Sequence, residues 1–384
     1  MAKAKEKPAE LPTLDVKLKT ADLLKAVNTI MLAVERRTTI PILNYVAIEP
    51  AADGIQLRSN DLDMEVVTRV HGEVDGIGAL ALPARRLRDI LRVVSHIPDL
   101  TIRMDDSGRA HLTAGNITAV LFSLPADELP RSNTTAAPAF TALIGEGALD
   151  WLISGVWHAV SNEETRYYLN GVAIEVDEDK VLAIATDGHR LATRSISLSA
   201  PVGKHAVFIV PRAAVAAVRT LAKGRQVEMS LLGRGHARFA FGETVFSTKL
   251  IDGTYPDWRR VVPKLAANTV DIEIADIRRA EALMRVRGDV ARPCRVAPDG
   301  DGVTLSANDP GEGEVSLVLP TTIAGTVPSF GVNPKYLADS ANALAGTGAT
   351  SIRLHVENAG DPIIAMPVGR DVAGEMHLLM PMRV

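Results

Sequence analysis

The sequence repeats itself with a period of about 125 residues, and this repetition limits the possible folds more than any other feature. The tetrapeptide VAIE occurs at residues 46–49 and again, unchanged, at residues 172–175, an offset of 126 residues. A Leu-Asn pair stands just ahead of both copies, and a fainter third copy begins at Val296. A fixed period of this kind indicates one structural unit copied along the chain.

Two further markers follow in each copy, in the same order. The first is a strand-like run that ends in a polar turn with an aspartate, and the second is a proline that opens a helical pattern. The aspartates are 126 and 122 residues apart, and the prolines are 128 and 123 residues apart. The markers are Asp61, Asp187 and Asp309, then Pro83, Pro211 and Pro334. Markers that share one period predict three tandem copies.

Each copy is predicted to contain two amphipathic helices, because apolar residues recur at spacings of three and four. The helices are expected at residues 20–37, 82–94, 147–161, 211–225, 275–288 and 332–344. Alternating β-branched segments between them, such as residues 207–210 and 351–356, are typical of half-buried antiparallel strands. The fold class is therefore α+β, with three tandem copies of a domain made of helices and an antiparallel sheet.

Segments rich in small and polar residues near 131–139 and 263–269 are predicted linkers. They divide the chain into domains at residues 11–135, 136–264 and 265–384, preceded by a disordered tail at residues 1–10. A chain of 384 residues is too long for one ordinary core, which agrees with this division.

Composition argues against several classes of protein. Hydrophobic residues make up 47% and charged residues 23%, as in a soluble globular protein, and no apolar run approaches the ~20 residues of a membrane helix. The single cysteine, Cys294, cannot form an internal disulfide or a cysteine-based zinc cluster, and it fits a reducing compartment. We therefore expect a cytoplasmic protein that does not contact the membrane.

The formal net charge of −4 argues against a nucleic-acid partner, but the charges are distributed unevenly. The six predicted helices contain 16 Lys and Arg against 7 Asp and Glu, whereas the rest of the chain contains 26 basic and 39 acidic residues. Helices that share one face would then attract phosphates without reading sequence. The simpler reading is that arginines on helix surfaces only keep those surfaces solvated.

Four motifs, in this order, resemble the bacterial DNA polymerase III beta subunit family, the replicative sliding clamps. They are RYYLNGVAIE at 166–175, ATDGHRLA at 185–192, FSTKLIDGTYPDWRRVVP at 246–263 and MPMRV at 380–384. The period and the domain order extend the resemblance over nearly the whole chain. It implies the DNA clamp fold, a head-to-tail homodimeric ring around double-stranded DNA, and a non-catalytic processivity factor without a cofactor.

The resemblance also implies partners and the residues that bind them. The partners are the DNA polymerase III alpha subunit, the clamp loader and other proteins with a clamp-binding motif. Their peptides would enter a hydrophobic cleft formed by Leu169, Thr186, Gly188, His189, Arg190, Leu191, the stretch 256–261 with Pro256, Arg260 and Val261, and the tail residues Leu378, Met380, Pro381, Met382, Arg383 and Val384. DNA contacts are expected from Arg37, Tyr167, Tyr168, Arg85, Arg86, Arg88, Arg92, Arg212 and Arg219.

At the subunit junction, the edge segment 117–124 is expected to meet the third domain near Met284 and Val286. Two residues depart from the family pattern: Glu163 replaces a polar neutral residue, which weakens phosphate contact, and Val384 replaces a leucine, which makes the cleft shallower.

An enzyme is the first alternative, because Asp187 and His189 precede several serines. The sequence contains no G-x-S-x-G elbow, and the aspartates of the other two copies lack a histidine two residues later, so we predict a turn. The histidines show no paired metal-ligand spacing. A repeat scaffold that binds peptides but not DNA, and a paralogous clamp kept for antibiotic resistance, remain open.

Overall fold

The computed structural model describes residues 13–105, 107–132, 136–233, 235–285, 293–300, 302–309, 313–369 and 374–384. The tail predicted at residues 1–10 lies outside this part of the chain. The described residues form two compact units. The first contains the residues up to Thr141 together with Val227–Lys249, and the second contains Ala142–Gln226 and Leu250–Val384.

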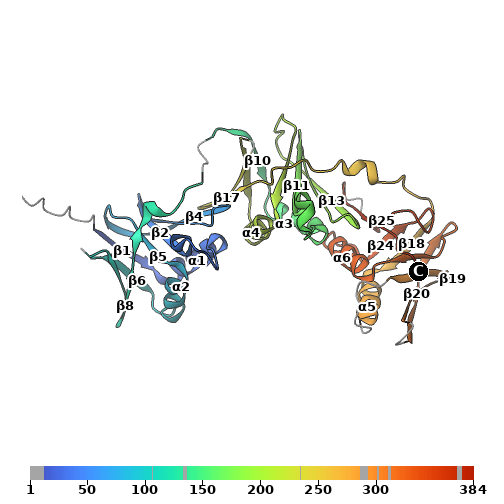
Figure 1. The fold of residues 1–384 in the computed structure, drawn as a ribbon, viewed down its shortest axis with the longest axis horizontal. Helices are drawn as coiled ribbons and strands as arrows, with labels where there is room; N and C mark the ends of the chain where they lie inside the picture. The colour runs from blue at the N-terminus through green and yellow to red at the C-terminus, as the bar shows by residue number, and fades with distance from the viewer. Residues whose placement is uncertain are drawn as a thin grey trace, which may run out of the picture. The chain divides into compact units, whose positions relative to one another are not determined.

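The same order of elements occurs three times along the chain: a strand, a helix, four strands, a second helix and three strands (Figure 1). The first copy comprises β1 (Leu14–Lys19), α1 (Thr20–Ile30), β2 (Tyr45–Ala51), β3 (Gly54–Asn60), β4 (Met64–Gly76), β5 (Leu80–Pro83), α2 (Ala84–Val93), β6 (Asp99–Met104), β7 (Arg109–Ala114) and β8 (Ile117–Phe122). The short strand β9 (Leu124–Pro125) follows it.

The second and third copies repeat this order. The second comprises β10 (Pro138–Ile144), α3 (Ala148–Val156), β11 (Gly171–Asp177), β12 (Lys180–Thr186), β13 (Arg190–Ser197), β14 (Ala206–Pro211), α4 (Arg212–Ala222), β15 (Val227–Leu232), β16 (His236–Phe241) and β17 (Thr244–Lys249). The third comprises β18 (Thr269–Glu273), α5 (Ile274–Arg285), β19 (Cys294–Asp299), β20 (Gly302–Asp309), β21 (Gly313–Pro320), β23 (Phe330–Val332), α6 (Pro334–Ala345), β24 (Ser351–His355), β25 (Ile363–Pro367) and β26 (Met376–Leu379), with the short β22 (Thr322–Ala324) added. The predicted α+β class is confirmed.

All six predicted helices are present, but α1 and α3 end seven and five residues earlier than predicted, and residues 286–288 of the fifth predicted helix lie outside the described residues. The first α-helix ends at Ile30 and tightens into a 3₁₀ turn over Met31–Ala33, as helix ends often do. Pro83 and Pro211 are the last residues of strands and cap the following helix, whereas Pro334 occupies the first helical turn of α6. The proline prediction was thus one residue early for two of the helices.

The turn aspartates behave as the sequence predicts in the first two copies. Asp61 accepts hydrogen bonds from the backbone N–H groups of Asp63 and Met64, at 3.1 and 2.7 Å. Asp187 accepts from those of His189 and Arg190, at 2.9 and 3.0 Å. Asp187 therefore closes a turn, and its carboxylate is not directed at the His189 imidazole. The side chain of Asp309, in the third copy, lies outside the described residues.

Strands pair between copies, which explains why the two compact units do not coincide with the predicted domain boundaries. β4 pairs antiparallel with β17, from Met64 opposite Thr248 to Thr68 opposite Thr244. β13 pairs in the same way with β26, from Arg190 opposite Leu379 to Thr193 opposite Met376. In both joints the last strand of one copy covers the edge of the preceding copy, so the edge is not left unpaired.

Candidate functional site

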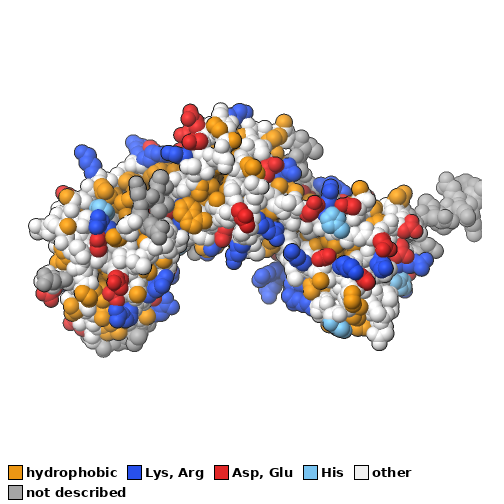
Figure 2. Space-filling view, turned by 180° about the vertical axis from the view of Figure 1, so that it is seen from behind, with side chains coloured by type: hydrophobic (Ala, Val, Ile, Leu, Met, Phe, Trp, Pro, Cys, Tyr) orange, Lys and Arg blue, Asp and Glu red, His pale blue; other side chains and the backbone are white. Residues whose placement is uncertain are grey.

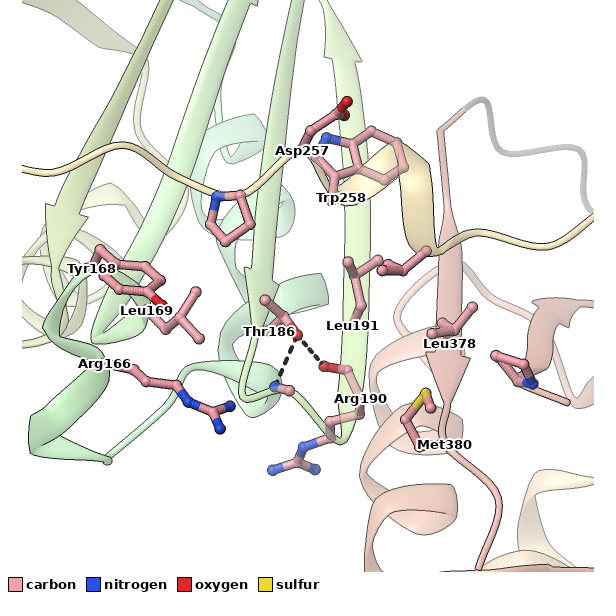
Figure 3. A pocket seen from close by; sticks show the side chains of 14 residues that line it. Arg166, Tyr168, Leu169, Thr186, Arg190, Leu191, Asp257, Trp258, Leu378 and Met380 are labelled. Atoms are coloured by element: carbon pink, nitrogen blue, oxygen red, sulfur yellow. Dashed lines mark hydrogen bonds between the residues drawn. The ribbon is translucent and has the colours of Figure 1, made fainter. Parts of the chain in front are cut away.

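A cavity of about 520 Å³ opens in the second unit, where the second and third copies meet at the β13–β26 pairing. Its walls come from segments far apart in the sequence, as Figure 3 shows. The lining residues are Arg166, Tyr168, Leu169, Thr186, Gly188, Arg190, Leu191, Pro256, Asp257, Trp258, Val261, Pro362, Leu378 and Met380.

The turn between β12 and β13 shapes the middle of this cavity. The Thr186 hydroxyl donates to the Arg190 carbonyl oxygen at 2.7 Å and accepts from the Gly188 N–H at 3.1 Å, as drawn in Figure 3. Gly188 has a φ of 87°, a left-handed conformation that favours glycine. The Met380 N–H donates to the His189 carbonyl oxygen at 2.9 Å, so the same turn also anchors the C-terminal segment.

The floor of the cavity is apolar. Leu191 and Leu378 face each other across the β13–β26 pairing and belong to one buried cluster with Ile364. Trp258 and Tyr255 pack against this cluster, and burial raises the pKa of the Tyr255 hydroxyl. A preformed apolar hollow of this size with a few polar groups at its edge suits an inserted aliphatic or aromatic side chain.

Two arginines stand at the rim in different electrostatic settings. Arg190 donates to Asp187 at 3.0 Å and to Asp339 at 2.7 Å, and its guanidinium lies 4.2 Å from the centre of the Tyr336 ring. These contacts fix the side chain and neutralise its charge. Arg166 is about half exposed and lies 3.5 Å from Glu163, a more open arrangement that leaves it available to an anionic group.

The cavity unites most of the residues predicted for the cleft, but not all of them. The predicted residues that line it are Leu169, Thr186, Gly188, Arg190, Leu191, Pro256, Val261, Leu378 and Met380. His189 and Arg260 are exposed and do not line it. The tail residues Pro381, Met382, Arg383 and Val384 line a separate hollow of about 800 Å³ on the third copy, where Met382 bridges Gly331.

Several lining residues were not named individually as cleft residues from the sequence. Asp257 and Trp258 lie inside the predicted stretch 256–261 without having been singled out, and Tyr168 was expected at DNA. Tyr168 lines the cavity and meets Tyr167 edge-on at 5.7 Å, so the two tyrosines form one aromatic pair at its rim. Arg166 begins the recognised motif 166–175, so the motif could have identified it as a cleft residue. No motif or pattern in the sequence points to Pro362.

The arginines predicted to contact DNA are exposed or half-buried, and all of them except Arg37 lie on α2 or α4. On α2, Arg86 and Arg92 are exposed, whereas Arg85 and Arg88 are half-buried and their Nε atoms lack a hydrogen-bond partner among the described residues. Arg37 is exposed just after the turn that follows α1. Figure 2 shows Lys and Arg side chains interspersed with Asp and Glu side chains, so the basic residues do not form one unbroken patch on that face.

On α4 the two predicted arginines share one aromatic partner. The guanidinium carbons of Arg212 and Arg219 lie 5.5 and 5.4 Å from the centre of the Trp157 ring. Arg219 is also held by α3, since it donates to the Ser154 hydroxyl at 3.2 Å and lies 4.0 Å from Asp150. These contacts orient both guanidinium groups along one face of α4.

Within the described ranges, no group of three or more His, Cys, Asp or Glu side chains is arranged to hold a metal ion. No helix of the described chain is long and apolar enough to cross a membrane.

Comparison with known proteins matches both the fold and the motifs. Residues 14–133 match the family model of the DNA polymerase III beta subunit, N-terminal domain, and residues 144–257 match that of the central domain. The beta sliding clamp of Caulobacter vibrioides strain NA1000 is 30% identical over 377 residues, which is 96% of this chain and 99% of the relative. The chain belongs to the bacterial beta sliding clamp family.

Further relatives and solved structures agree with this assignment. The beta sliding clamp of Escherichia coli K12 is 26% identical over 365 residues, 94% of this chain and 98% of the relative. A DnaN sliding clamp from Pseudomonas aeruginosa, solved bound to griselimycin, superposes with a TM-score of 0.89 at 27% identity and covers 97% of this chain and 100% of its own. The clamp from Bartonella birtlesii gives 0.88 at 28% identity, with the same coverage. The chain is therefore a DNA sliding clamp, a processivity factor and not an enzyme.

Proposed function

We propose that two copies of this sliding clamp close head to tail into a ring around duplex DNA and hold polymerases there through the apolar cavity. The joint that recurs between copies carries this proposal, because the same pairing, used once more between two chains, closes the ring. A head-to-tail contact between subunits forms a ring when the rotation that it imposes returns to the starting subunit, and the use of one kind of joint throughout favours such a ring.

The strands for such a junction stand at the ends of their sheets. In the described chain, β8 stands at one end of its sheet and β21 stands at one end of another. By position in the copy, β8 corresponds to β17 and β26, whereas β21 corresponds to β4 and β13. We therefore expect β8 of one subunit to pair antiparallel with β21 of the other.

The register of this pairing follows from the two observed joints. Glu65 and Leu191 hold the same position in their hairpins. Glu65 pairs with Ser247 on β17, and Leu191 pairs with Leu378 on β26. The residue in that place on β21 is Glu314, opposite Asn308 in its hairpin. The residue of β8 that matches Ser247 is Val120, three residues into the strand. Glu314 should therefore lie opposite Val120.

Side-chain alternation on the two strands supports this register. Val315 and Leu317 on β21 pack against the core of the third copy, and the register puts them opposite the half-buried Ala119 and Ile117 of β8. The exposed Val120 lies opposite the exposed Glu314. A slip of one residue would set inward side chains opposite outward ones.

This junction differs from the one expected at residues 284–286. Met284 is buried in the core of the third copy and offers no surface to a second subunit. Val286 lies outside the described residues.

We further propose that the ring holds DNA by encirclement and by charge. Arg86 and Arg92 on α2, Arg212 and Arg219 on α4, and Arg37 would face phosphates, which gives attraction without sequence specificity and with strong salt dependence. Encirclement needs no base contact, so the affinity of the ring for DNA and its retention on circular DNA can be measured separately. Bacterial DNA lies in the cytoplasm, and we place the ring there.

For partners, we propose that the apolar cavity takes linear peptides from the polymerase III alpha subunit, the clamp loader and other proteins with a clamp-binding motif. Leu191, Leu378, Trp258 and Met380 would hold the apolar anchor of the peptide. The hollow lined by residues 381–384 would take part through the same C-terminal segment.

The decisive experiment combines the mass of the protein in solution with its retention on DNA. A dimer loaded on nicked circular plasmid should stay bound through gel filtration and be lost when a restriction enzyme linearises the plasmid. A peptide-binding scaffold that does not encircle DNA would be lost equally from both forms. Retention that is independent of linearisation, or a monomer at micromolar concentration, would contradict the ring.

A further inference from the structure

A second hollow continues the cavity on the side of the third copy. It has a volume of about 410 Å³. It is lined by Pro263, Lys264, Leu265, Ala266, His355, Glu357, Asp361, Pro362 and Ile364. Pro362 lines both hollows, and the segment that lines the first with Trp258 and Val261 lines the second directly afterwards. The two hollows are therefore successive parts of one groove.

The two hollows also share an apolar floor. Ile364, on β25, lines the second hollow and belongs to the same buried cluster as Leu191 and Leu378, which line the first. Leu265 is 58% exposed and stands beside Pro263 at the edge of the second hollow. An aliphatic side chain packed against Leu265 would cover apolar surface that is open to water.

The charges at the two ends of the groove differ in sign. The second hollow has two carboxylates, Glu357 and Asp361, against the single ammonium group of Lys264. Asp361 accepts one hydrogen bond, from the Asn358 amide at 2.7 Å, and Glu357 makes no ion pair within the described residues. The first cavity has the open guanidinium of Arg166 at its rim, whereas its lining carboxylate, Asp257, lies away from Arg166 and beside Trp258 (Figure 3). A chain lying along the groove would therefore meet positive charge at one end and negative charge at the other.

We propose that the second hollow is an extension of the partner-peptide site, which takes an aliphatic residue and a Lys or Arg that flank the apolar anchor of the same peptide. The inference rests on the proposed peptide-binding function of the first cavity. The flanking residue sets the direction of the bound chain, because its charge matches only the end of the groove that holds Glu357 and Asp361.

The test uses the full chain and fluorescein-labelled synthetic peptides in a polarisation assay. The short probe has a Leu-Phe pair between single serines. The extended probes add Leu-Lys before or after this pair, with one to three glycines as a spacer, and the matched probes add Leu-Glu instead. We expect the Leu-Lys extension on one side only to bind about tenfold more tightly than the short probe, and the Leu-Glu extension to gain less than twofold.

Variants then connect the gain to the second hollow. Glu357→Lys should abolish the Leu-Lys gain and transfer it to Leu-Glu, and Leu265→Ser should reduce the gain severalfold, while the short probe binds all variants equally. Leu143→Ser is the matched control, since Leu143 is a similarly exposed leucine outside both hollows. If the short probe binds and no extension improves it, or the gain survives in Glu357→Lys, the extension is refuted while the cleft stands. If no probe binds, the cleft itself fails.

Discussion

At the scale of single residues, the most constrained group is the Arg194 side chain, which is only 1% exposed. It forms an ion pair with the fully buried Glu375 and donates to the carbonyl oxygens of Trp151 and Ala343, at 2.8 Å each. The pair joins β13 of the second copy to the residue that directly precedes β26 of the third. Removing one partner of a buried pair leaves a charge without compensation and costs about 3–5 kcal/mol. Gly155 is required beside it, because a Cβ there would collide with the guanidinium.

The two histidines next to this pair predict a pH dependence of stability. The rings of His158 and His377 lie 4.9 Å apart, and His377 Nε2 is 3.5 Å from Glu375. Burial lowers the pKa of both imidazoles, and the positive charges of Arg190 and Arg194 lower it further. The Glu375 carboxylate opposes this decrease in the pKa of His377. The nearby Lys335 adds to the decrease in the pKa of His158. Since the folded-state pKa lies below the unfolded value of about 6.5, the unfolded chain binds more protons below that pH, and stability falls as pH decreases.

Thermal unfolding at pH 7.5 and pH 5.5 measures this effect. We expect the melting temperature to drop at pH 5.5, with each histidine contributing at most about 1.4 kcal/mol per pH unit below 6.5. His377→Gln should make the drop smaller, and His96→Gln, a substitution at an exposed histidine, should leave it unchanged. Glu375, whose pKa is lowered by His377 and Arg194 against the effect of burial, titrates below this pH window. An equal drop in His377→Gln would contradict the assignment.

The contacts of Gly331 show how the C-terminal segment is held. Its carbonyl oxygen accepts from the Met382 N–H at 2.9 Å, and a Cβ at Gly331 would collide with the Met382 carbonyl oxygen and the Val384 side chain. Gly331→Ala should displace the segment, make Val384 about tenfold more sensitive to carboxypeptidase, and cost about 1–3 kcal/mol. Gly360→Ala, which changes another glycine of the same hollow with open space around it, is the control and should behave as wild type.

At the scale of elements, α2 allows the contribution of charge to be separated from packing. Leu87 and Leu91 are fully buried, whereas Arg86 and Arg92 are exposed. Replacing both exposed arginines by serine should leave the melting temperature nearly unchanged. It should also make the slope of log K for DNA binding against log salt concentration shallower by about 0.9 for each phosphate that is no longer neutralised.

Arg85→Ser and Arg88→Ser form the contrasting pair, because these side chains bury part of their stems and their removal should also cost stability. A salt slope that is identical before and after the Arg86 and Arg92 substitutions would remove α2 from the DNA interface.

The elements themselves could be predicted from local sequence, but the pairing between them could not. Apolar spacing identified α2 and α4 to within about three residues of their observed ends, since a helix buries its own periodic face. The pairing of β4 with β17 depends on residues about 180 positions apart, and no local pattern specifies it. The buried pair of Arg194 and Glu375 was missed for the same reason: charged residues are rarely buried, and only the distant partner makes burial tolerable.

The candidate cleft shows the same limit. Residues 169, 186 and 188 through 191 fall in recognised motifs, so the motifs located them. Pro362 enters the lining only because β25 runs beside β26, which carries Leu378. Tyr168 was expected at DNA because the family resemblance implied it and tyrosines can stack on exposed bases, and only the fold reveals that it lines the cavity.

At the scale of the whole molecule, the two joints within the chain support the third joint that we propose between chains. β4 with β17 and β13 with β26 use equivalent strands in equivalent registers. The strands left at the ends of their sheets, β8 and β21, are the remaining members of this series. Unpaired edges are prone to uncontrolled association, and a closed ring pairs both at once.

A designed disulfide tests the register and the closure together. Residues directly opposite in antiparallel strands have Cα atoms about 4.5–5.5 Å apart, within the range that a disulfide spans. Val120→Cys combined with Glu314→Cys should therefore cross-link both junctions of the dimer under mild oxidation. The native Cys294 is buried and should not take part. Ala119→Cys combined with Glu314→Cys, one residue out of register, is the control and should cross-link poorly.

If the variant with Val120→Cys and Glu314→Cys is oxidised after loading on nicked circular plasmid, the protein should remain with the plasmid in SDS until the DNA is linearised or a reductant is added. Cross-linked dimers that separate from intact circles in SDS would show that the β8–β21 junction does not close around DNA.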